Sequence, residues 1–214
     1  RDSYQTAYLK AYYPTEFFSA ALSSDMDNTN KIINLLTACN ELNIKINSPN
    51  INSSTYNFQP SNNESINYGL CAIKGVGENA AKHITDVRLK DGLFINIKDF
   101  CSRVNLNTVN SGTIESLISS GCFDSISEES RTDNIENLDK LMSQGLKTQL
   151  DLASGQSELF TSEIGATSTI KEKKLSIAPP SNDELIKERK VLGYYLSSHP
   201  INKYKEELLS LIHI

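Results

Sequence analysis

Apolar residues recur at helical spacing along most of the chain, which predicts a mainly α-helical protein with a small β portion. Residues 4–23 are expected to form two packed helices separated at Pro14, because proline interrupts helical hydrogen bonding. A third helix is expected over residues 29–42, with an N-cap available from Asp27-Asn28-Thr29. The chain therefore opens with a helical segment.

The pattern changes between residues 44 and 68. Short β-like stretches at 44–46, 55–58 and 65–68 are separated by Asn, Ser and Pro, which are turn residues. This composition predicts a small hairpin or lobe within the helical chain.

Further helices are expected in the rest of the chain. Asp133 and Glu136 have capping-box spacing ahead of an apolar stripe that runs toward Leu152. A polar tract follows from Thr161 to Asn182, and Asp183 is expected to cap the next helix. The predicted helical ranges are about 78–90, 98–104, a segment ending near 121, 133–152, 184–196 and 200–212.

A glycine hairpin stands out at Cys71-Ala-Ile-Lys-Gly-Val-Gly-Glu-Asn-Ala-Ala-Lys-His-Ile84. It is predicted to join two short helices, because Gly75 and Gly77 interrupt an otherwise apolar helical pattern. Glycine has no Cβ, so backbone N–H groups at the start of the next helix can face a phosphate oxygen. We therefore expect a helix-hairpin-helix element that binds the DNA backbone through Lys74, Gly75, Val76, Gly77 and Lys82. An ordinary helical turn with a glycine C-cap is the simpler alternative.

Residues 98–121 could repeat this unit, with Asn105-Leu-Asn-Thr-Val-Asn110 as the second turn. This turn has neither the glycine pair nor lysines. A structural role is therefore expected for it.

Composition limits the remaining possibilities. The chain has 214 residues, 38% of them hydrophobic, and a formal charge of −5, so any DNA contact must be local. No apolar run has membrane-spanning length, and the first residues do not form a signal peptide, which favours a cytoplasmic protein; the absent initiator Met suggests a fragment. Four cysteines with no C-x-x-C spacing indicate buried thiols rather than a metal site: Cys39, Cys71, Cys101 and Cys122.

Other reactive residue types have simpler explanations. The tyrosines at 4, 8, 12 and 13 could stack on bases, but their helical spacing favours core packing. His83 could contact phosphate or lie on the plain surface, and His199 with its neighbouring serines lies in a helix-breaking turn. Asp25 and Asp27 lie between helices, so capping is preferred to metal binding.

Several motifs occur together along the chain: Tyr4-Gln-Thr-Ala-Tyr-Leu-Lys10, Tyr13-Pro-Thr-Glu-Phe17, Asp25-Met-Asp-Asn28, Pro49-Asn-Ile-Asn52, Tyr68-Gly-Leu70, Ala72-Ile-Lys-Gly-Val-Gly77, Ser120-Gly-Cys-Phe-Asp124 and Leu192-Gly-Tyr-Tyr-Leu196 with His199-Pro200. Through these motifs and their order, the chain resembles the alpha subunit of bacterial DNA polymerase III, a replicative polymerase. The resemblance extends over nearly the whole chain.

The resemblance implies three parts. Residues 1–66 would end the fingers region, 67–163 would form a tandem helix-hairpin-helix domain, and 164–214 would lead toward an oligonucleotide-binding-fold domain. Gln156-Ser-Glu-Leu-Phe160 falls where the family carries a peptide that binds the sliding clamp. Leu159 and Phe160 would fill an apolar pocket on the clamp, and the Gln156 amide would bond at its rim.

The resemblance also indicates what is missing. The family's palm domain, which holds the magnesium ions for DNA-directed DNA synthesis, has no counterpart here, so no catalytic residue, metal site or cofactor is expected in this piece and no polymerase activity from it alone. Duplex DNA, the sliding clamp and other replicative holoenzyme subunits are the expected partners. A stand-alone helix-hairpin-helix repair protein, with Asp99 as a conceivable catalytic residue, and a protein-interaction scaffold remain the alternatives.

Overall fold

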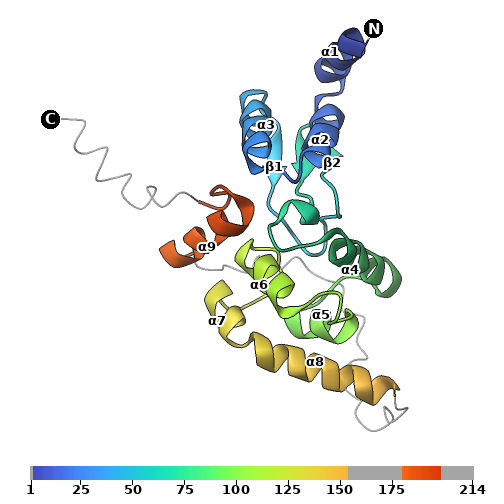
Figure 1. The fold of residues 1–214 in the computed structure, drawn as a ribbon, viewed down its shortest axis with the longest axis vertical. Coiled ribbons are helices and arrows are strands. Elements are labelled where there is room, and N and C mark those ends of the chain that lie inside the picture. Colours follow the sequence, from blue (N-terminus) through green and yellow to red (C-terminus); the bar gives the residue numbers. More distant parts are fainter. Residues whose placement is uncertain (1, 154–179, 199–214) are drawn as a thin grey trace, which may run out of the picture.

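The computed structural model describes residues 2–153 and 180–198 (Figure 1). Three helices open the chain: α1 (Asp2–Tyr12), α2 (Pro14–Ser24) and α3 (Thr29–Glu41). Pro14 is the first residue of α2, and the Asn28 side chain accepts a hydrogen bond from the Lys31 amide at the start of α3. The predicted break and the predicted cap are both confirmed.

The expected core position of the N-terminal tyrosines is wrong. Tyr4, Tyr8, Tyr12 and Tyr13 are exposed by 76%, 45%, 68% and 52%. The reason is visible in Figure 1, where α1 extends away from the rest of the molecule and has α2 as its neighbour. Helical spacing identified one face of α1, but within the described residues nothing large covers that face.

A small three-stranded sheet follows, made of β1 (Lys45–Asn47), β2 (Gln59–Asn62) and β3 (Ser65–Asn67) in the order β1-β3-β2. β1 pairs with β3 in parallel, with Ile46 opposite Ile66, and β2 pairs with β3 antiparallel. The mainly α fold with a small β portion is therefore confirmed.

One predicted strand, at residues 55–58, is wrong. The carbonyl of Thr55 accepts a hydrogen bond from the Leu70 amide, and the carbonyl of Tyr56 accepts one from the Cys71 amide. Phe58 is buried and packs edge-on against Tyr68, with ring centroids 4.8 Å apart. The apolar residues of this stretch therefore fill the core beside the turn at residue 70, and the strand forms one residue later.

The second half is a helical domain containing a 3-10 turn η1 (Leu70–Ala72) and the helices α4 (Glu78–Asp91), α5 (Ile97–Arg103), α6 (Ser111–Ser119), α7 (Arg131–Glu136), α8 (Leu138–Ala153) and α9 (Asn182–Leu192). Phe94, Phe100 and Phe123 stack edge-on at its centre, with successive centroids 5.0 and 5.1 Å apart. Long-range contacts between these rings explain why segments far apart in sequence form one core.

The long helix α8 packs closely on α5. A Cβ at Gly145 would lie 2.6 Å from the Cys101 carbonyl oxygen, so only glycine allows this approach. The Gln149 amide donates to the Cys101 and Val104 carbonyls, which have no helical partner at the end of α5.

Two helix starts differ from expectation. The side chain of Ser130, rather than Asp133, caps α7. This helix ends at Glu136, with Asn137 as its C-cap, before α8 begins, so the single helix expected over 133–152 is two helices. Ser181, rather than Asp183, caps α9 and forms a capping box with Glu184. Serine precedes each acidic residue by two or three positions and takes the cap because its short side chain reaches the third amide of the helix. None of the helices described is both long and apolar enough to cross a membrane.

Candidate nucleic-acid interface

The glycine hairpin runs from the 3-10 turn η1 to the first residue of α4. Gly75 has φ of +91°, a conformation that side chains rarely adopt, and the Val76 amide closes the turn by donating to the Ile73 carbonyl at 3.0 Å. The Val76 side chain is 5% exposed and anchors the turn in the core. The predicted hairpin is present, although its first helix is a single 3-10 turn.

The start of α4 is left open. Gly77 is its N-cap residue, has ordinary backbone angles (φ −76°, ψ 157°) and makes no side-chain cap, and a Cβ there would meet nothing within 4 Å. By contrast, a side chain caps each of α3, α5, α6, α7 and α9. Among the described residues no acceptor bonds the amides of Glu78, Asn79 and Ala80, so they can receive an anion.

Two lysines flank this open helix start. Lys74 is exposed and forms no ion pair with any described carboxylate. Lys82, one turn into α4, has its Nζ 2.6 Å from Glu78 and 5.4 Å from the ring centroid of Tyr56. The hydrogen bond and charge of Glu78 raise the pKa of Lys82, and Lys82 lowers the pKa of Glu78 in return. The local charge is therefore less positive than the lysines alone suggest.

The second helical pair supports the hairpin from behind. The hydroxyl of Thr113 in α6 donates to the Gly75 carbonyl at 3.1 Å, and a Cβ at Gly75 would lie 2.5 Å from the Ser116 hydroxyl. The start of α6 is closed, because Asn110 accepts from the Thr113 amide. These contacts favour the structural role expected for the second turn.

His83 also has a structural role, because its Nε2 accepts a hydrogen bond from the Asn105 amide at 2.8 Å. This bond joins α4 to the second turn. A phosphate contact by His83 would have to compete with it.

A buried ion pair between α7 and α9 was not evident from the sequence. Arg131 donates to Glu188 at 2.7 Å and to Asp124 on its other side, and Glu188 is 0% exposed. Although burial acts to lower the pKa of Arg131, the two carboxylates raise it above its usual value. Glu188 also accepts from the amides of Leu196 and Ser197. Only the docking of α9 brings these residues together, and no local pattern marks them.

Asp124 lies just after the positive-φ residue Gly121 (φ +83°), where a Cβ would collide with the Arg131 guanidinium. The Ser120-Gly-Cys-Phe-Asp124 motif thus combines a turn that needs glycine with a carboxylate for Arg131. Through the contact of Asp124 with Arg131, which also pairs with Glu188, the motif helps to hold α7 and α9 in place.

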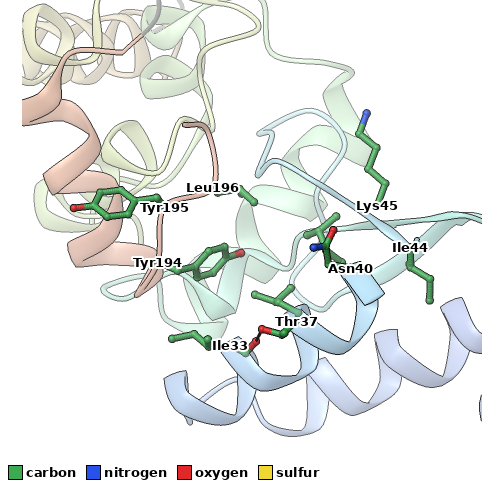
Figure 2. A pocket seen from close by; sticks show the side chains of 10 residues that line it. Ile33, Thr37, Asn40, Ile44, Lys45, Tyr194, Tyr195 and Leu196 are labelled. Carbon is green, nitrogen blue, oxygen red and sulfur yellow. Dashed lines mark hydrogen bonds between the residues drawn. The ribbon is translucent and has the colours of Figure 1, made fainter. Parts of the chain in front are cut away.

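A cavity of about 560 Å³ lies between α3, β1 and residues 194–196 (Figure 2). Figure 2 shows Tyr194 turned toward the α3 side chains Ile33 and Thr37, whereas Tyr195 points away from them. None of the hairpin residues lines this cavity. The cavity lies where α3 and β1 meet the segment that follows α9.

Two acidic residues that the sequence offered as candidates have structural partners. Asp99 pairs with Arg103 at 3.0 Å and accepts from the Ile95 amide, which accounts for it as a residue of a helix start. Asp25 ends α2 and pairs with Lys31. Residues 2–153 and 180–198 contain no group of three or more His, Cys, Asp and Glu that could hold a metal. Gln156, Leu159, Phe160 and His199 lie outside the described residues.

Comparison with known proteins gives two results that agree with this geometry. Residues 43–133, which contain both hairpins, match the helix-hairpin-helix motif family. Over 96% of its length the chain is also homologous to one segment of bacterial DNA polymerase III alpha subunits.

Three such relatives illustrate the similarity. The chain is 36% identical over 207 residues to DNA polymerase III subunit alpha of Vibrio cholerae. It is 38% identical over 208 residues to that of Haemophilus influenzae and 37% identical over 209 residues to that of Escherichia coli K12. Each match includes 96% of this chain but only 18% of the length of the relative. The chain thus contains a helix-hairpin-helix motif and corresponds to one segment of these polymerase subunits.

Proposed function

We propose that this chain binds the sugar-phosphate backbone of duplex DNA through the open start of α4, as part of a replicative DNA polymerase III alpha subunit. The observation that carries the proposal is the contrast between α4, which has no side-chain cap, and the capped start of α6. Free amides, the positive end of a helix and an unpaired Lys74 suit a phosphate oxygen. Nothing in this arrangement reads a base, so binding should be independent of sequence.

The roles in this proposal are specific. The amides of Glu78, Asn79 and Ala80 would bind the phosphate directly, with Gly75 and Val76 holding the turn in place and Gly77 leaving the helix start open. Lys74 and Lys82 would add charge beside it, and Lys82 would do so by exchanging its Glu78 partner for phosphate. In the longer polypeptide this grip would hold the duplex product of DNA-directed synthesis, a reaction for which magnesium ions would be held by a palm domain outside this chain.

The test compares Lys74→Ala with Lys82→Ala against a control pair, Lys140→Ala with Lys147→Ala, whose exposed side chains lie on α8. Both double variants remove two positive charges. Fluorescence anisotropy with two duplexes of unrelated sequence, repeated over a range of salt, measures affinity and the number of phosphate contacts. We expect the hairpin variant to bind both duplexes equally weakly, with a salt slope lower by about 0.9 per lost contact, or up to about 1.8 in total. Equal slopes for the two double variants would refute the assignment.

Clamp binding is a separate part of the proposal. Leu159 and Phe160 would insert into a pocket on a bacterial sliding clamp, with the Gln156 amide bonding at its rim. The tethered clamp would keep the polymerase on DNA through a high effective concentration. Surface plasmon resonance of wild type and of Leu159→Ala with Phe160→Ala over immobilised clamp tests this. Saturable binding that the double variant loses is the expected result, and equal binding would reject the peptide. The other holoenzyme subunits and a cytoplasmic location belong to the same proposal.

A further inference from the structure

The last turn of α9 is joined to the DNA-binding hairpin by a backbone hydrogen bond. The amide of Lys74 donates to the carbonyl of Val191 at 2.9 Å, one residue before Gly75. Val191 packs against the core and Leu192 is 2% exposed. The end of α9 is therefore a fixed neighbour of the hairpin, although more than a hundred residues separate them in sequence.

The exposed charge at this end of α9 is positive. Arg189 and Lys190 lie in its last turn, both are exposed, and neither is paired with any described carboxylate. Glu184 and Glu188 are buried and their oxygens are occupied by hydrogen bonds. The remaining acid of the helix, Asp183, lies in the first turn at the opposite end.

Two features hold this turn in position. Glu188 is anchored by Arg131 from α7 and by the amides that follow α9. Gly193 ends the helix in the left-handed conformation (φ +90°), where a Cβ would collide with the Thr29 methyl carbon of α3. Both ends of the contact are thus fixed before any ligand binds, which limits the ordering cost of binding.

We propose that the last turn of α9 is a further part of the nucleic-acid interface, in which Lys190 contacts a backbone phosphate next to the one held by the hairpin. The inference rests on the proposed function. Its physical basis is that Lys74 and Lys190 are unpaired cations on two segments bonded backbone to backbone, while Lys82 is engaged by Glu78. Arg189 is directed to Tyr195, 5.3 Å from its ring centroid, and so is the weaker candidate.

The experiment is duplex binding by Lys190→Ala, with Lys147→Ala as the matched control for loss of one exposed helical lysine. Affinity depends on salt to the power of about −0.9 for each phosphate contact, so loss of one contact should lower the salt slope by about 0.9 and raise Kd about 8-fold at 0.1 M salt. Lys190→Ala should show this change with duplexes of any sequence. Lys147→Ala should keep the wild-type slope.

The outcomes separate the two proposals. A Lys190→Ala slope equal to that of Lys147→Ala, with a clear Lys74→Ala effect, would overturn this inference and leave the hairpin assignment standing. Absence of duplex binding by the folded wild-type chain at low salt would overturn both. Because Lys190 is exposed and its side chain bonds to none of the described residues, its removal should leave the far-UV circular dichroism spectrum unchanged.

Discussion

Removal of the Arg131 guanidinium should destabilise the protein more than removal of any exposed cation. The Arg131 side chain is 8% exposed and its partner Glu188 is 0% exposed. Arg131→Met keeps much of the volume but leaves the Glu188 carboxylate buried without its counter-charge. Loss of one partner from a buried pair typically costs about 3–5 kcal/mol.

The structure indicates the lower part of that range. Glu188 would keep hydrogen bonds from the Leu196 and Ser197 amides and from the Ser197 hydroxyl, and Asp124 has a side chain 40% exposed to water. We therefore expect a loss of about 3 kcal/mol, a large fraction of the roughly 5–15 kcal/mol typical of a domain. With a urea m-value of about 2 kcal/mol/M, the midpoint would fall by about 1.5 M.

The assay is urea unfolding followed by far-UV circular dichroism and by tyrosine fluorescence, since the chain has 9 tyrosines and no tryptophan. Lys31→Met is the control, because its pair with Asp25 is exposed (59% and 32%) and should be worth less than about 1 kcal/mol. A loss for Arg131→Met no greater than that of the control would refute the conclusion that this network holds α9. Non-coincident transitions by the two probes would show local release of α9 instead of global unfolding.

Three further predictions follow from individual contacts. Glu78→Gln should tighten duplex binding and steepen its salt dependence, because the Glu78 carboxylate no longer competes with phosphate for Lys82. Anisotropy measures this, and an unchanged slope would exclude Lys82 from the interface. Burial raises the pKa of Cys101 to about 11 and of Cys122 to about 12, so both thiols should resist DTNB at pH 8 in the folded chain and react in urea; rapid labelling of either without denaturant would contradict their burial. Burial acts to raise the pKa of Glu184, but hydrogen bonds from Ser181 and Thr132 lower this pKa overall. The stability that Glu184 contributes is therefore present above the ordinary value of 4.5 and is lost as pH falls through the lowered pKa. Glu184→Gln should reduce the difference in unfolding free energy between pH 6 and pH 3, and an unchanged difference would rule this contribution out.

Local chemistry decided much of this fold. Pro14 separates two helices because it lacks an amide hydrogen, and Gly92 ends α4 because it adopts φ of +84° without a Cβ penalty. Gly75 likewise adopts a positive φ without a Cβ penalty, so the residue pattern alone was enough to locate the hairpin. Where local signals competed, as at Ser130 and Asp133, spacing alone selected the wrong cap.

Only the tertiary structure decided which of these features form a site. The sequence by itself identified the hairpin residues Lys74, Gly75, Val76, Gly77 and Lys82, which lie within a short stretch of chain. The Glu78–Lys82 pair has i,i+4 spacing, so it too could have been expected from the sequence. The sequence could not show that α1 leaves its tyrosines exposed or that α9 returns to the hairpin. The physical reason is range: caps and turns depend on neighbours within about four residues, whereas burial and ion pairing depend on which distant segments pack together.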